Sequence, residues 1–111
     1  MKQTDLDKII AFRCGKIADV LKSKNREYAP GDDALHNFKR AGQMLGQSPE
    51  SALVGFWAKH IVSILDIVND LPGPGESMDY LDIDLVDEKI GDAINYLVLL
   101  ESLIKERKGN I

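Results

Sequence analysis

The chain has 111 residues, of which 44% are hydrophobic and 29% charged, so it suits one globular domain spanning residues 1–111. A net charge of −4 and dispersed basic residues argue against a protein that holds duplex nucleic acid. The single cysteine excludes an intramolecular disulfide and a paired-cysteine metal site. Because the N-terminus lacks an apolar signal core and no stretch reaches a membrane-spanning length, we expect a cytoplasmic protein without a membrane partner.

The first predicted helix runs from about residue 4 to residue 24. Thr4 and Asp7 resemble a capping box, which is typical of a helix start. Apolar residues follow at helical spacing: Leu6, Ile9, Ile10, Cys14, Ile17, Ala18 and Leu21. Since Cys14 falls on this apolar face, we expect it to be a small buried hydrophobe rather than a reactive thiol.

A short helix and a long one are predicted next. Pro30 and Gly31 end the first helix, and Asp32 or Asp33 can cap a short helix that ends at Gly46. The third helix starts at the Ser48-Pro49-Glu50 segment, which combines a hydroxyl cap, a proline at the first position and an acid. We expect it to bury one apolar set: Leu53, Val54, Trp57, Ile61, Ile64, Leu65 and Val68.

The last helix is predicted over residues 84–108, after an extended lead that is too short and isolated to form a sheet. One side predicts a core seam made of Val86, Ile90, Ala93, Leu97, Leu100 and Ile104. The second half is apolar almost all round, which favours contact with another copy of the chain. The fold class is therefore all-α, a compact bundle of about four helices that oligomerises through the C-terminal helix.

A polar stripe on this last helix is the first candidate site. Glu88, Asp92 and Asn95 lie on one side at about 100° per residue, and the stripe leads into apolar turns. A carboxylate pair beside a buried surface needs cations, hydrogen bonds or a metal to offset its desolvation. If a metal is used, Glu88 and Asp92 suit Mg²⁺, which takes one or two carboxylates plus substrate phosphates. A solvated first helical turn is the alternative reading.

A second candidate site is the segment after the first helix. Its residues combine cations for phosphate, an aromatic face for a base, and polar groups for sugar hydroxyls: Lys24, Asn25, Arg26, Tyr28, Asp33 and Asn37. An ordinary charged loop is the alternative interpretation. Asp33 and Asn37 lie one helical turn apart, which favours a site.

The third helix contributes Lys59 and His60, and Tyr96 follows the polar stripe as a candidate stacking ring. The position of His60 beside the apolar face favours a hydrogen-bonded core histidine, with ligand contact as the alternative. No zinc-type spacing, phosphate-binding glycine loop or nucleophile–base pair occurs, so the sequence gives nucleophilic catalysis no support.

Four segments also occur in a recognisable order: Lys24-Asn25-Arg26-Glu27-Tyr28, Asp33…Asn37-Phe38, Lys59-His60 and Glu88-Lys89…Asp92…Asn95-Tyr96. From about residue 20 to residue 104, the chain resembles the nucleotide-modification-associated domain family, small all-α proteins common in phages and prophages. The resemblance implies nucleotide handling, in the cytoplasm of a host cell if the chain is phage-encoded. The chain is also distantly similar to MazG-like nucleoside triphosphate pyrophosphatases, helical oligomers that bind Mg²⁺ through ExxE and ExxD pairs.

Glu88 and Asp92 are spaced as ExxxD, and no ExxE pair precedes them, so binding is favoured over hydrolysis. We therefore expect a viral-type protein that holds a phosphorylated nucleotide, or a nucleotide-derived signal of host defence, in a pocket between helices near a subunit interface. One alternative is a Mg²⁺-dependent nucleotide pyrophosphohydrolase or an accessory enzyme of phage DNA metabolism. Another is a helical protein-interaction module whose polar stripes are only surface.

Overall fold

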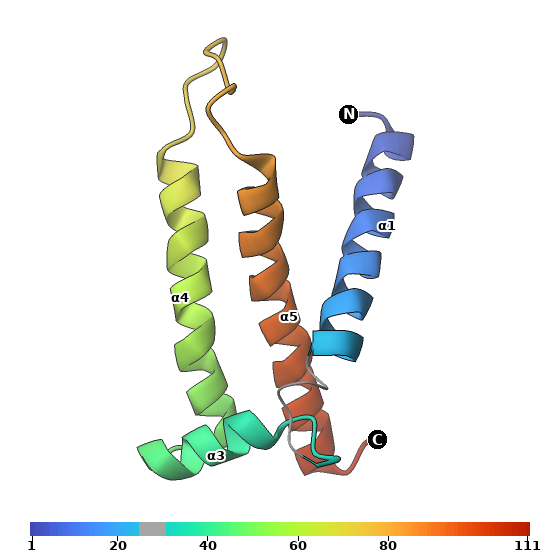
Figure 1. Cartoon of the computed structure of the whole chain (residues 1–111), viewed down its shortest axis with the longest axis vertical. Coiled ribbons are helices and arrows are strands. Elements are labelled where there is room, and N and C mark those ends of the chain that lie inside the picture. The colour runs from blue at the N-terminus through green and yellow to red at the C-terminus, as the bar shows by residue number, and fades with distance from the viewer. Residues whose placement is uncertain (25–30) are drawn as a thin grey trace.

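The computed structural model describes residues 1–24 and 31–111, apart from the side chain of Lys24. Its elements are helix α1 (Gln3–Asp19), the π-helical turn η1 (Val20–Lys24), and helices α3 (His36–Leu45), α4 (Pro49–Asn69) and α5 (Ile83–Lys108). None of the described residues forms a strand, so the all-helical prediction is confirmed. Figure 1 shows α4 and α5 side by side and antiparallel, α3 across one end of the pair, and α1 on the other side of α5.

Local signals set most helix ends where the sequence predicts them. The Ser48 hydroxyl accepts a hydrogen bond from the Ser51 N–H at 3.1 Å, which caps the first turn of α4. Gly46 has a φ of 64° and ends α3, a left-handed conformation that glycine adopts without strain. The α5 cap is Asp82, whose Oδ1 accepts from the Asp84 N–H at 2.9 Å, so this helix begins at residue 83.

The buried core lies where α3, α4 and α5 meet. Its fully packed side chains are Leu35, Phe38, Leu53 and Leu103, and five partly buried side chains pack against them: Phe56, Trp57, Tyr96, Leu99 and Leu100. Gly42 allows α3 to turn tightly into α4, because a Cβ at this position would lie 2.8 Å from the Gln47 carbonyl oxygen. The three helices thus form one packed unit that includes the second half of α5.

Helix α1 lies apart from this core, and two expectations about it are wrong. None of its residues is buried, and Cys14 is exposed, because α1 makes few contacts with α5 and stands outside the core that the other described helices form. Its first helical residue is Gln3, and the preceding Lys2 provides no side-chain cap, so Thr4 and Asp7 do not form a capping box. An apolar face without cover is the main feature of this helix.

The expected core seam of α5 is also wrong in part. Within the seam Ala93 is buried and Leu100 packs against the core, whereas Ile90, Leu97 and Ile104 are 38%, 46% and 53% exposed. Likewise Val54, Leu65 and Val68 of α4 are exposed rather than inward. The chain alone therefore leaves apolar faces uncovered on three helices.

Helix α4 also corrects the expectation about membrane-spanning length. It has 21 residues and a mean hydropathy of 1.5 in its most apolar stretch, only 11% of which is buried, so by length and composition it could cross a membrane. Length and composition alone do not distinguish such a helix from a soluble one. Lys59 and Asp66 lie within it.

Candidate functional site

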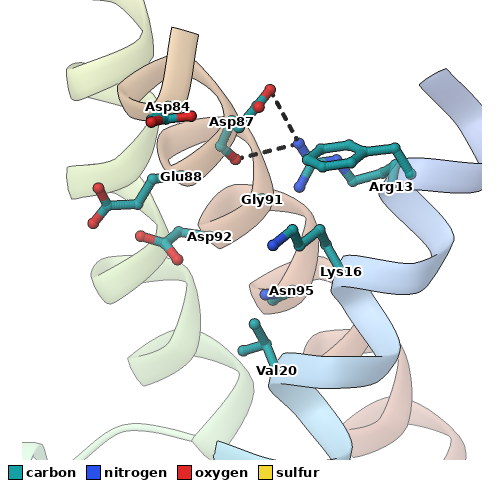
Figure 2. A pocket seen from close by; sticks show the side chains of 10 residues that line it. Arg13, Lys16, Val20, Asp84, Asp87, Glu88, Gly91, Asp92 and Asn95 are labelled. Atoms are coloured by element: carbon teal, nitrogen blue, oxygen red, sulfur yellow. Dashed lines mark hydrogen bonds and ion pairs between the residues drawn. The ribbon is translucent and has the colours of Figure 1, made fainter. Parts of the chain in front are cut away.

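A cavity of about 460 Å³ lies between α1 and the first half of α5. Pockets of this size accommodate small organic ligands. Ten side chains line it: Phe12, Arg13, Lys16, Val20, Asp84, Asp87, Glu88, Gly91, Asp92 and Asn95. In Figure 2 Arg13 and Lys16 reach in from α1, while the acidic side chains project from successive turns of α5. The cavity thus has a cationic wall on α1 and an acidic wall on α5, with Glu88 and Asp92 turned away from Arg13 and Lys16 in Figure 2, toward α4.

The cationic wall is held in place by contacts of α1 with α5. The Arg13 guanidinium donates a hydrogen bond to the Asp87 carbonyl oxygen at 3.2 Å and lies 4.0 Å from the Asp87 carboxylate. Gly91 makes room for it, because a Cβ there would lie 2.5 Å from Nη1 of Arg13. The Phe12 ring centroid is 5.4 Å from Cζ of Arg13 and 5.6 Å from Nζ of Lys16. A flat ring and two cations therefore lie together.

The acidic wall follows the predicted polar stripe. Asp84, Asp87, Glu88 and Asp92 lie along α5, and Asn95 lies on the next turn. Four carboxylates face two cations, so the cavity has a surplus of negative charge that disfavours a bare anion. Asn95 is only 8% exposed, and its Oδ1 is buried without a hydrogen-bond partner in the described part of the chain. Such an atom is costly unless a ligand or water donates to it.

Beyond the acidic wall, Asp92 connects the cavity to the core. Its Oδ2 lies 3.7 Å from Nδ1 of His60 on α4. The rings of His60 and Tyr96 are 4.9 Å apart, and Tyr96 meets Phe38 edge-on at 5.9 Å. Burial, and to a lesser extent the charge of Asp92, raises the pKa of Tyr96 above its ordinary value. The structure thus brings His60 and Tyr96 next to the stripe, behind the cavity.

Other predicted site residues lie elsewhere. Asp33 Oδ2 accepts from Lys39 Nζ at 2.8 Å, and the same amine lies 2.7 Å from Glu106 near the end of α5. The Lys39 ammonium, with the Leu35 N–H, lowers the pKa of Asp33, and the two carboxylates raise the pKa of Lys39. Asn37 lies on α3. This cluster ties α3 to α5 and does not line the cavity.

Lys59 is exposed on α4 and is also absent from the cavity wall. Asn25, Arg26 and Tyr28 lie outside the described residues, as does the side chain of Lys24. The predicted site is therefore divided: Glu88, Asp92 and Asn95 share one cavity with His60 and Tyr96 behind them, while Asp33, Asn37 and Lys59 do not belong to it.

Three residues of α1 that line the cavity were not predicted: Phe12, Arg13 and Lys16. A signal for them exists, because Arg13 and Lys16 are one helical turn apart on a helix whose other polar residues are of mixed charge. Only the folded structure shows that this pair faces the carboxylate stripe.

The described residues include no group of three or more His, Cys, Asp or Glu side chains that could hold a metal ion. Two carboxylates on adjacent turns, Glu88 and Asp92, still fit Mg²⁺, which takes much of its coordination from water and phosphate. Comparisons with family models, with curated proteins and with solved structures find no match to this chain.

Proposed function

We propose that the cavity between α1 and α5 binds a phosphorylated nucleotide together with Mg²⁺. The observation that carries the proposal is Asn95, a residue of the cavity wall whose Oδ1 is buried beneath that wall and has no hydrogen-bond partner among the described residues. A ligand N–H or O–H that donates to it removes a desolvation cost of about 1–3 kcal/mol. Nucleotide bases and sugars carry such donors.

The opposite wall suits the remaining parts of a nucleotide. Lys16 is a cation of the cavity wall that can bind phosphate oxygens, and Arg13 can do so if a phosphate replaces its contact with Asp87. Guanidinium groups bind phosphate with charge-assisted and often paired hydrogen bonds. Phe12 offers an aromatic face to a base. The cations that the sequence suggests are not needed for this assignment: Arg26 lies outside the described residues, and Lys59 is exposed on α4 and does not line the cavity.

The charge of the cavity supports a divalent cation as part of the ligand. Phosphate alone would meet four carboxylates and two cations, whereas a Mg²⁺ complex brings compensating positive charge. Glu88 and Asp92 are the residues that would hold the ion. Mg²⁺ bound there would neutralise phosphate charge.

We favour binding over turnover, because no nucleophile–base pair lines the cavity. With the resemblance to phage nucleotide-modification-associated proteins, this supports a viral-type protein that holds a nucleotide-derived signal in the cytoplasm and removes it from host defence. The surplus of carboxylates favours one alternative, a MazG-like Mg²⁺-dependent pyrophosphohydrolase.

The test is incubation with a panel of mono-, di- and triphosphates of the four bases and with cyclic dinucleotides, each with Mg²⁺ and with EDTA. Chromatography then identifies the ligand that the protein releases. Intact nucleotide bound only with Mg²⁺ supports the proposal, and new products support the hydrolase. Failure of every nucleotide to bind contradicts both and favours a helical interaction module.

A substitution in the acidic wall assigns the binding to this cavity. Asp92→Asn removes a charged ligand contact and is expected to cost about 1–3 kcal/mol of affinity in the panel titration, measured by calorimetry. Asp66→Asn, at an exposed position on α4, is the matched control and leaves affinity unchanged. Equal effects of the two substitutions would contradict a site at Asp92.

A homo-oligomer is the partner arrangement that we propose for this function. Three leucines of α5 pack in the core of their own chain: Leu99, Leu100 and Leu103. We therefore do not assign them to the proposed contact between copies. Leu97 and Ile104 remain exposed on the same helix and support an interface there.

A further inference from the structure

We infer that a second copy of this chain docks onto an apolar surface formed by α1 and α5, and that this docking fixes the cationic wall of the nucleotide cavity. The surface includes a groove of about 620 Å³ between the two helices, lined chiefly by Ile9, Ile10, Phe12, Ile83, Ile90 and Ile94. We call it the α1–α5 groove. It lies next to the nucleotide cavity, because Phe12, Arg13 and Asp87 line both.

The first support for a docked helix is a heptad stripe on α5. Ile83, Ile90, Leu97 and Ile104 recur at every seventh residue, and each is more than a third exposed. A seven-residue apolar repeat keeps one face turned toward a neighbouring helix along its whole length. Among the described residues, α1 covers only part of this stripe, since its first two members line the α1–α5 groove and all four remain more than a third exposed.

The second support is α1 itself. It has 17 residues, none of them buried, whereas most helical stability in proteins comes from packing of an apolar face. Ile9 and Ile10 are about half exposed. At 1.5 Å per residue α1 is about 25 Å long, which matches the stripe from Ile83 to Leu97 closely enough for a partner's α1 to lie along it. The helix therefore needs cover, and an identical helix fits the surface that it helps to form.

The third support is the solvent-accessible surface area of the chain. A compact monomer of 12.3 kDa exposes about 6,100 Å², whereas this chain exposes 8129 Å². The surplus of roughly 2,000 Å² exceeds the roughly 800 Å² that each partner contributes to a stable interface. One reciprocal contact, with α1 of each copy in the α1–α5 groove of the other, would cover much of it and form a four-helix layer.

Charge selects a second copy over a membrane as the occupant. The net charge of −4 disfavours an anionic lipid surface, and it also disfavours a second copy, so the charge at the groove itself decides. The charged pair at the rim of the groove, Arg13 and Asp87, already neutralises itself within one chain. An identical copy therefore meets no excess of like charge there.

The consequence for the cavity, which rests on the proposed function, is that assembly and binding support each other. A docked copy holds α1 against α5, and α1 carries Arg13 and Lys16, the proposed phosphate contacts. Separation of the copies leaves α1 with only its partial contact to α5. Dimer formation is thus expected to raise nucleotide affinity, and the nucleotide to favour the dimer by the same factor.

The experiment compares the intact chain with three glutamate variants without nucleotide, by sedimentation velocity and light scattering. Wild type is expected at twice the chain mass of 12.3 kDa, and Ile10→Glu and Leu97→Glu at one chain mass. Leu65→Glu is the matched control, since Leu65 is as exposed but lies on α4, and it stays dimeric. The wild type and the three variants should give the same helical circular dichroism.

A monomeric wild type overturns the proposal, as does loss of the dimer in Leu65→Glu alone, which would move the interface to α4. Flotation with phosphatidylglycerol vesicles adds a further arm: a wild-type chain that floats as a monomer has a membrane as its occupant instead. Cys14 gives an independent readout, because it lines the α1–α5 groove and is the chain's single cysteine. A short bismaleimide should join two wild-type copies, and a dimer that it cannot join contradicts α1 at the interface.

The coupling is measured with ATP and Mg²⁺ as the probe, by calorimetry. The Leu97→Glu monomer is expected to bind at least about fivefold more weakly than wild type, although Leu97 does not line the nucleotide cavity. Equal affinity of monomer and dimer overturns the coupling and leaves the proposed function intact. Absence of ATP binding in a wild-type dimer contradicts the proposed ligand and leaves the interface intact.

Discussion

Asn95 is buried at the point where the cavity meets the core, and its Oδ1 has no partner among the described residues. A chain optimised only for stability would place an apolar residue there, because an unsatisfied buried acceptor costs free energy. Residues that cost stability in this way are typical of binding sites, where the ligand supplies the missing partner. Stability and binding should therefore respond in opposite directions to substitution at this position.

Asn95→Leu keeps the number and branching of the side-chain heavy atoms and removes the buried polar atoms. We expect a free energy of unfolding equal to wild type or higher by up to about 2 kcal/mol, and a loss of nucleotide affinity of about 1–3 kcal/mol. Urea unfolding followed by the fluorescence of Trp57 measures the first, and calorimetry the second. Asn69→Leu, at the exposed end of α4, should change neither. A destabilised Asn95→Leu that still binds would show that the amide has a structural role.

Gly91 separates helix stability from binding in a different way. Gly91→Ala adds a Cβ 2.5 Å from Nη1 of Arg13, so the guanidinium must leave its position over α5. The gain in helix propensity, about 1 kcal/mol, offsets the lost hydrogen bond, and the free energy of unfolding should change by less than about 1 kcal/mol. Nucleotide affinity should fall.

The matched control for this substitution is Gly55→Ala on α4, where a Cβ meets nothing within 4 Å. It should stabilise the fold by about 1 kcal/mol and leave binding unchanged, as measured by the same denaturation and titration. Unchanged affinity in Gly91→Ala would place the ligand away from Arg13.

At the scale of helices, local chemistry predicts the ends well and the packing poorly. The helix ends predicted at Gly46 and Ser48 are confirmed, because capping depends on a few neighbouring residues. The inward face of α1 is wrong because burial depends on what lies opposite, and α1 has little opposite it within the chain. The same apolar spacing that predicts a core seam also describes an interface between copies.

The site shows the same division between local and long-range information. Periodicity alone joins Glu88, Asp92 and Asn95, since they lie within two turns of one helix. Arg13 contacts Asp87 across 74 positions of sequence, and no pattern along the chain reveals that distance. Asp33 has the chemistry that the sequence suggests, yet it pairs with Lys39 of α3. Lys39 also pairs with Glu106 near the end of α5, away from the cavity.

The cluster of Asp33, Lys39 and Glu106 joins α3 to α5 through ion pairs that depend on pH. The lowered pKa of Asp33 means that its ion pair stabilises the fold fully above the ordinary value of 3.8, and that this contribution is lost as the pH falls through the lowered value. Lys39→Met should therefore destabilise at neutral pH, by less than about 1 kcal/mol because the groups are partly exposed. The difference should vanish at low pH.

Thermal unfolding of the two proteins across this pH range measures the effect. Arg40→Met is the control, because it also removes one positive charge from α3 and Arg40 bonds to neutral Gln43. A difference between wild type and Lys39→Met that persists unchanged below the lowered pKa of Asp33 would contradict the ion pair as its source.

The single chain is more extended than a compact protein of the same length. Its radius of gyration is 16.8 Å, whereas a compact chain of this length has about 13 Å. Figure 1 shows the reason, since α1 stands beside α5, apart from the core that α3, α4 and α5 form. The core of α3, α4 and α5 accounts for the stability of one part only, and the proposed assembly would stabilise the remainder.

Assembly makes stability depend on protein concentration. If two copies unfold together, mass action raises the thermal midpoint with concentration, by about 3 °C for each tenfold increase in a dimer of this size. We expect this slope for wild type in calorimetric scans over two decades of concentration. Leu97→Glu should show no slope, because a glutamate in the heptad stripe would bury an unpaired charge in the dimer. Leu65→Glu on α4 should keep the wild-type slope, which separates loss of the interface from a general effect of added charge. A wild-type midpoint that is independent of concentration would mean that one chain folds alone with its apolar faces in water.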